Sequence, residues 1–251
     1  MLRETKMLEG CLVRAMDGPA GRVAGVLLDD EVWAVRYLIV DTGGRLPGER
    51  VLMLPDFVEG VNEAMPASIR VGLTRERVWE SPPVEADRPV SVRQEADYYA
   101  YLAAAPCRGV SRPVSPLYVD PEAGKEEEGD PHLRSAREVR GFAVRSGEDR
   151  SVGHVEDLVY DDSDWAVRYL IVDTRDWLPA KKVPVSADWV SGISPSGAQV
   201  EVDLTAEEMH TAPGWEPGTI MDRRYETELH AHYGRTPYWV RRQDHSNMRE
   251  D

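Results

Sequence analysis

The chain has 251 residues and a formal net charge of −15, with 10 Tyr, 7 Trp and only 2 Phe. This length is enough for two domains, each with its own hydrophobic core. Lys and Arg are not clustered, which disfavours direct nucleic-acid binding because phosphate recognition needs basic clusters, and the acidic charge disfavours attachment to anionic membranes.

The first part of the chain reads as a series of short strands. Apolar and β-branched residues recur between Gly, Pro and Asp turn signals, which predicts strands at residues 7–13, 21–28, 33–40, 51–54 and 69–73. Residues 55–58 read as a tight turn with an aromatic anchor. Thr74 is placed to cap a short helical turn that stops before Pro82. Residues 1–84 are therefore expected to form one small β-barrel.

Residues 85–134 are expected to connect this barrel to a second one. A helix is predicted over residues 94–105. Residues 106–134 are rich in Pro, Gly and charge, with KEEEG at their centre, which is typical of a flexible linker.

Residues 135–214 repeat the pattern of the first barrel. Strands are predicted at residues 139–144, 153–160, 165–172, 183–185 and 200–204. Thr205 and Glu208 have the spacing of a capping box, which predicts a helix start. Residues 215–251 form a C-terminal tail with a second helix over residues 222–233. The two tail helices share a tyrosine start, which matches Tyr98–Leu102 with Tyr225–Leu229.

The ten residues WAVRYLIVDT occur twice, at residues 33–42 and 165–174. Aligning residues 21–58 with 153–190 gives 19 identities in 38 positions. Solenoid repeats run at about 20–50 residues, so this much longer period predicts two copies of a whole small domain. The identical positions are mainly apolar or turn-forming, which indicates that the copies share a fold and not a duplicated active site.

Both faces of the repeated strand are apolar from Tyr37 to Val40, which predicts that both sides are covered. One side is the barrel interior. The other is expected to meet the second copy or, alternatively, a C-terminal helix or loop. The predicted surface between the barrels consists of Tyr37, Ile39, Val40, Tyr169, Ile171 and Val172.

The ordered set of motifs resembles the PRC-barrel family over residues 7–84 and 136–214. Its carriers are the repeated strand, the closing LTRERV and LTAEEM, and the Gly-x-Val and Leu-Pro motifs at Gly21, Val23, Leu46, Pro47, Gly153, Val155, Leu178 and Pro179. The family includes the cytoplasmic domain of the photosynthetic reaction-centre H subunit and the C-terminal domain of a ribosome maturation factor. The resemblance implies an all-β fold of two tandem small PRC-like β-barrels with short helical tails, used for docking. It implies neither of those particular roles.

No catalytic, cofactor-binding or metal-binding residue is predicted. Nucleophile-elbow and phosphate-loop motifs are missing, and Cys11 and Cys107 have no ligand spacing, which fits a reducing cytosol. The aspartate pairs at residues 29–30 and 161–162 suit a divalent cation, but more plainly they solvate a turn. Four histidines near the C-terminus also lack ligand spacing: His210, His230, His232 and His245.

The sequence favours a non-enzymatic cytoplasmic adaptor with an unknown protein partner and no cofactor. No apolar run approaches the length of a membrane span, so membrane insertion is not expected. The barrels are expected to pair within the chain, and a homo-oligomer is left open. Partner docking is predicted at Tyr98, Tyr101, Tyr238 and Trp239 because interfaces favour aromatic anchors; equally, these residues would cover the barrel ends of their own chain. Two alternatives are a ribosome- or RNA-processing-associated factor that acts through protein contacts, and a small-ligand or metal-binding stress protein.

Overall fold

The chain divides into two compact units in the computed structural model, which describes residues 1–43, 49–62, 64, 66–84, 90, 92–104, 130–174, 181–216 and 221–240. The N-terminal unit comprises Arg3–Val139 together with Tyr160–Val167. The C-terminal unit comprises Met1–Leu2, Arg140–Val159 and Arg168–Asp251.

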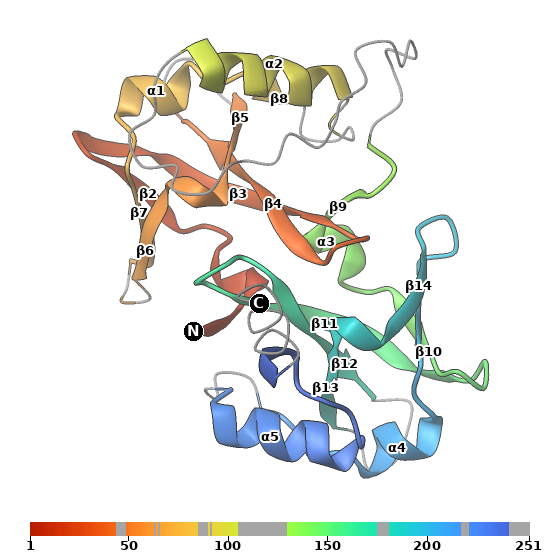
Figure 1. Cartoon of the computed structure of the whole chain (residues 1–251). Coiled ribbons are helices and arrows are strands. Elements are labelled where there is room, and N and C mark those ends of the chain that lie inside the picture. Colours follow the sequence, from red (N-terminus) through yellow and green to blue (C-terminus); the bar gives the residue numbers. More distant parts are fainter. Residues whose placement is uncertain are drawn as a thin grey trace, which may run out of the picture. The chain divides into compact units, whose positions relative to one another are not determined.

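The N-terminal unit is built on one sheet with the strand order β6-β7-β2-β3-β4-β5-β8, and β9 lies beside β3 (Figure 1). Neighbouring strands are antiparallel except for β2 and β7, which are parallel. The strands are β2 (Leu12–Ala15), β3 (Gly18–Asp29), β4 (Ala34–Asp41), β5 (Arg50–Met53), β6 (Val58–Asn62), β7 (Ser68–Val71), β8 (Pro83–Val84) and β9 (Leu133–Ser135). The helices are η1 (Thr5–Met7), η2 (Pro55–Phe57), α1 (Arg75–Trp79), α2 (Val92–Ala104) and α3 (Ala136–Val139).

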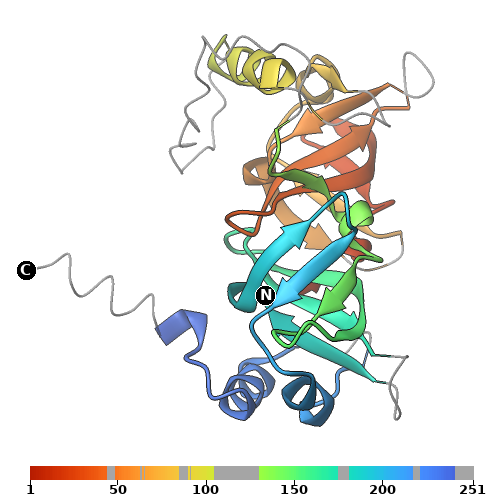
Figure 2. The same cartoon turned by 90° about the vertical axis from the view of Figure 1, so that its right-hand side faces the viewer.

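The second sheet repeats this strand order. It runs β13-β12-β11-β10-β15-β14, with β1 (Leu2–Glu4) beside β11. Its other strands are β10 (Ala143–Arg145), β11 (Ser151–Asp161), β12 (Val167–Asp173), β13 (Lys182–Ser186), β14 (Val190–Ser194) and β15 (Gln199–Val202). The helices are η3 (Ala187–Trp189), α4 (Ala206–Thr211) and α5 (Arg223–His232), and Figure 2 shows α4 and α5 side by side. β10 and β15 are parallel, as β2 and β7 are.

The expected all-β class with short helices is confirmed, and several element bounds differ from the prediction. The expected strand at residues 7–13 is a 3-10 turn followed by β2. The expected strand at residues 139–144 begins only at Ala143, after α3. β6 and β14 were missed. Each contains a glycine and few buried side chains, so neither shows the apolar alternation that marks a strand.

The repeated glycine before the long strand is required by close backbone packing. Gly21 has φ 149° and Gly153 has φ 141°, in a region that other residues rarely adopt. A Cβ at Gly21 would lie 2.3 Å from the carbonyl oxygen of Asp41, and one at Gly153 would lie 2.1 Å from that of Asp173. Any side chain at these positions would therefore force the two strands of the hairpin apart.

The repeated tryptophan lies outside the strand predicted to begin with it: Trp33 is in a turn one residue before β4, and Trp165 is two residues before β12. Trp33 has φ 49° and Trp165 has φ 60°, an uncommon conformation for a bulky residue. Both belong to the N-terminal unit. The backbone N–H of Val35 donates to the carbonyl of Trp165 at 2.8 Å, and that of Val167 donates to the carbonyl of Trp33 at 2.7 Å. The starts of the two repeated strands thus pair with each other inside this unit.

The last part of the predicted linker is folded into the N-terminal unit. β9 pairs with β3, with Leu28 opposite Arg134, and the backbone N–H of Asp30 donates to the carbonyl of His132 at 2.9 Å. The predicted domain boundary between residues 134 and 135 therefore falls inside β9, and the N-terminal unit continues to Val139. The rest of the predicted flexible linker, residues 106–129, lies outside the described residues.

Candidate functional site

A buried polar cluster lies between the sheet of the N-terminal unit and helix α2. Tyr37 is fully buried in the middle of β4, and Glu95 in the first turns of α2 is 2 % exposed. The Tyr37 hydroxyl donates to Oε1 of Glu95 at 2.8 Å and lies 3.3 Å from the hydroxyl of Tyr99. Burial, followed by the neighbouring Glu95 carboxylate, raises the pKa of Tyr37, so this phenol stays protonated.

Arg36 joins three carboxylates to this cluster. Its guanidinium lies 2.8 Å from Glu95, 3.2 Å from Asp29 and 2.6 Å from Asp130. Burial lowers the pKa of Arg36, but Glu95 and the other acidic neighbours outweigh it and raise the pKa overall. For Glu95, burial raises the pKa, and Arg36 and Tyr37 oppose this only in part. Arg36 therefore joins helix α2, the β3–β4 hairpin and Asp130, which lies three residues before β9.

The C-terminal unit has a related cluster under α5. The Tyr169 hydroxyl donates to Oε1 of Glu226 at 2.9 Å and lies 3.1 Å from Nε2 of His230. Both Glu226 and His230 are buried. The Tyr238 hydroxyl also donates to Glu226, at 3.1 Å. Burial and the Glu226 carboxylate raise the pKa of Tyr169, and the same two causes raise that of Tyr238 to about 12.

The two clusters fix how the tail helices correspond. Glu95 follows Tyr37 by 58 residues and Glu226 follows Tyr169 by 57. Tyr99 and His230 therefore occupy matching places, four residues after each glutamate. The tyrosine-based match of Tyr98 with Tyr225 was wrong by one helical turn. A better signal in the sequence was the pair of glutamates at nearly the same distance from the repeated tyrosine.

The residues predicted to dock a partner from the first tail are engaged within their own unit. Tyr98 is 1 % exposed, and its hydroxyl accepts from the backbone N–H of Leu54 at 2.8 Å. The Tyr101 hydroxyl donates to the carbonyl of Arg77, and the Arg77 guanidinium lies 4.3 Å from the centre of the Tyr101 ring. A cavity of only about 10 Å³ remains between α2 and the strands, about the limit for one water molecule.

The second predicted docking pair is placed in the same way. Tyr238 is 9 % exposed and bonds to Glu226. Trp239 is half-buried and lies 4.0 Å under the guanidinium of Arg223. Tyr98, Tyr101, Tyr238 and Trp239 are thus packed within their own unit, and docking of a partner at these residues stays a prediction.

The repeated strand is covered on both faces. Over Tyr37 lies α2 and over Tyr169 lies α5, which is the helical covering considered as an alternative. Ile39 is half-buried. Val40, Ile171 and Val172 are fully buried. Pairing of the two barrels through these residues stays a prediction.

The aspartate pairs and the C-terminal histidines are also engaged. Asp29 accepts from the backbone N–H groups of Glu31 and Val32 and so caps the hairpin turn, and Asp161 caps Ser163 in the same way. Asp30 pairs with His132 and Arg134. His232 contacts the carbonyl of Glu208 at 2.9 Å. His245 and Cys107 lie outside the described residues, and Cys11 is buried.

The position of the second repeat agrees with a comparison against protein families. The model of the PRC-barrel domain matches residues 131–209, from the residues before β9 to α4. Residues 131–209 are a PRC-barrel domain. Curated proteins gave no match. In the part of the chain that the structure describes, no helix is long and apolar enough to cross a membrane.

Proposed function

We propose that the protein is a non-enzymatic, cytoplasmic docking module made of two tandem PRC-like barrels, each closed by its own tail helix. The observation that carries the proposal is the repeated cluster: in both units a buried glutamate of the tail helix accepts from the repeated tyrosine of the sheet. The six-strand order shared by the two sheets supports the assignment of the N-terminal unit as a second PRC-like barrel.

The repeated polar groups support docking rather than chemistry. Catalysis requires titratable groups that can reach a substrate in a concave site. Here Tyr37, Glu95, Tyr169 and Glu226 bond to each other under a helix. The two units therefore share the way in which the tail helix is attached to the sheet, and this attachment also sets which face of the helix points to solvent.

The outward faces of the two helices match. In the correspondence set by the glutamates, Asp97 matches Glu228 and Ala100 matches Ala231, and all four residues are exposed. This exposed pair, an acidic residue with an alanine three positions after it, is the outward patch of each helix. We propose that this patch binds a partner protein with a basic surface, because complementary charge speeds and selects association.

Site-specific photo-crosslinking in cells tests this proposal. Benzoylphenylalanine in place of Ala100 or Ala231 should crosslink to a partner that is not captured from the control position Glu59, which is exposed on β6. Charge reversal by Asp97→Lys or Glu228→Lys should reduce the crosslinking at the same helix several-fold. Crosslinks that are the same at Glu59, or that survive charge reversal, would show that the helix faces do not dock a partner.

A further inference from the structure

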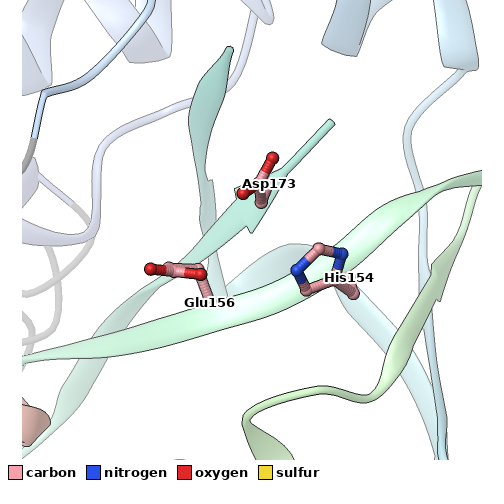
Figure 3. Close-up of side chains that lie close together, drawn as sticks. All are labelled: His154, Glu156 and Asp173. Atoms are coloured by element: carbon pink, nitrogen blue, oxygen red, sulfur yellow. The ribbon is translucent and has the colours of Figure 1, made fainter. Parts of the chain in front are cut away.

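A cluster of possible metal ligands lies on the sheet of the C-terminal unit, apart from the tail-helix clusters. His154 and Glu156 are two residues apart on β11, so their side chains project from the same face of the strand. Asp173 is the last residue of β12. One ligand atom from each of the three lies within 4.8 Å of the other two, and Figure 3 shows His154 and Glu156 on one strand with Asp173 on the strand beside it.

We propose that His154, Glu156 and Asp173 bind one divalent transition-metal ion of the Zn²⁺ type, with a fourth position open to solvent. An imidazole with two carboxylates is a donor set that Zn²⁺ accepts, and three protein ligands with one open position are common at zinc sites. Bonds of about 2.0–2.2 Å place tetrahedral ligand atoms about 3.4 Å apart. Movements of the ligand atoms by roughly 1 Å, through side-chain rotation, would therefore bring the three groups onto one ion.

The charge at the cluster suits a cation. Nζ of Lys182 lies 2.9 Å from Oε1 of Glu156. In the β12–β13 register, Lys182 is the residue opposite Asp173. The two carboxylates and this one ammonium group together carry a net negative charge. Asp173 is only 4 % exposed, so its attraction to an ion is weakly screened by water. The lysine ammonium occupies a place where a metal ion would compete with it for Glu156.

The N-terminal unit shows that the fold itself does not require these ligands. At the matching positions it has Arg22, Ala24, Asp41 and Arg50. Arg22 lies opposite Asp41, and Asp41 lies opposite Arg50, in a sheet with the same strand order. Two of the three ligands are thus replaced while the backbone frame is kept. Only the second copy has the full set of three ligands, and the first copy shows which residues the same backbone accepts in their place.

Calorimetric titration of the full chain with Zn²⁺ tests the proposal. The wild-type chain should bind one ion at this site with a dissociation constant in the micromolar range or below. His154→Arg and Glu156→Ala introduce the residues found at Arg22 and Ala24, so both variants should fold with an unchanged melting temperature without metal. Each should weaken binding at least about tenfold, the effect seen even when a group that only hydrogen-bonds to a zinc ligand is changed. His132→Ala is the matched control, since His132 is also paired with a carboxylate, and it should leave binding unchanged.

Two further variants sharpen the test. Lys182→Ala removes the competing ammonium group and should tighten binding. Arg22→His combined with Ala24→Glu should create a second site beside Asp41 and raise the stoichiometry from one ion to two. Equal Zn²⁺ binding by the wild type and His154→Arg would overturn the proposal, as would a wild-type chain that binds no Zn²⁺. A folded Arg22→His, Ala24→Glu variant that gains no ion would also count against it. The proposal does not depend on the docking function.

Discussion

Replacing Arg36 by Met is expected to destabilise the N-terminal unit by about 3–5 kcal/mol, the usual cost of removing one partner from a buried ion pair. The Arg36 side chain is 12 % exposed, and the carboxylates of Asp29, Glu95 and Asp130 that surround it are 6 %, 3 % and 17 % exposed. Met fills much of the same volume, so the loss comes mainly from the carboxylates that are left without their shared cation.

Hydrogen exchange read by mass spectrometry over β4 and β5, in increasing urea, would measure this loss in the N-terminal unit alone. The control is Arg70→Met, since the Arg70–Glu59 pair is 68 % and 55 % exposed and should contribute less than about 1 kcal/mol. Adding Glu95→Gln to Arg36→Met should recover part of the loss because it removes a buried, uncompensated charge. A loss below about 1 kcal/mol for Arg36→Met, or no recovery in the double variant, would show that the cluster does not hold helix α2.

Three other outcomes are expected. Gly153→Ala should lower the free energy of unfolding, measured with heat or urea, by about 3 kcal/mol or more, because the new Cβ would clash with a carbonyl oxygen. The control Gly10→Ala is also at positive φ but has no atom within 4 Å, so it should cost only the backbone strain of about 1–2 kcal/mol. Burial raises the pKa of Glu95 above 4.5, so its contribution to stability is complete below pH 4.5 and is lost as pH rises through the raised pKa. The free energy of unfolding, measured over a pH series, should therefore fall with rising pH in the wild type, and Glu95→Gln should lack this fall. Limited proteolysis is expected to cut first within residues 105–129, and the two fragments should elute together in gel filtration because β9 stays paired with β3; fragments that separate at micromolar concentration would contradict this.

The barrel strands could be predicted from the sequence because their signal is local. The repeated WAVRYLIVDT and its flanking turns show alternation and turn chemistry within ten residues, and β4 and β12 lie close to the expected positions. β6 and β14 were not predicted because this local signal is missing: their residues are half-buried or exposed, and each strand contains a glycine. The repeated Gly-x-Val could be recognised as a motif, but its cause, a backbone contact across the hairpin, was not visible in the sequence.

The tail-helix clusters and the proposed metal site could not be found from a local pattern because each joins residues from different elements. Glu95 and Glu226 look like ordinary surface glutamates of amphipathic helices, and only the contact with a tyrosine 58 or 57 residues earlier explains their burial. The histidines near the C-terminus drew attention through their number. His154 has Glu156 two residues away in the sequence, but Asp173 joins them only when β11 and β12 come together.

The matched PRC-barrel region ends at residue 209, before α5 begins at Arg223. A protein expressed from that region alone would have the strands but neither Glu226 nor His230, so the Tyr169 hydroxyl would lose both partners and the apolar surface around it would face water. The smallest piece of this chain that can be purified as a stable barrel is thus longer than the piece that family comparison recognises. For the same reason, shortened versions that end near residue 210 are expected to aggregate even though every strand is intact.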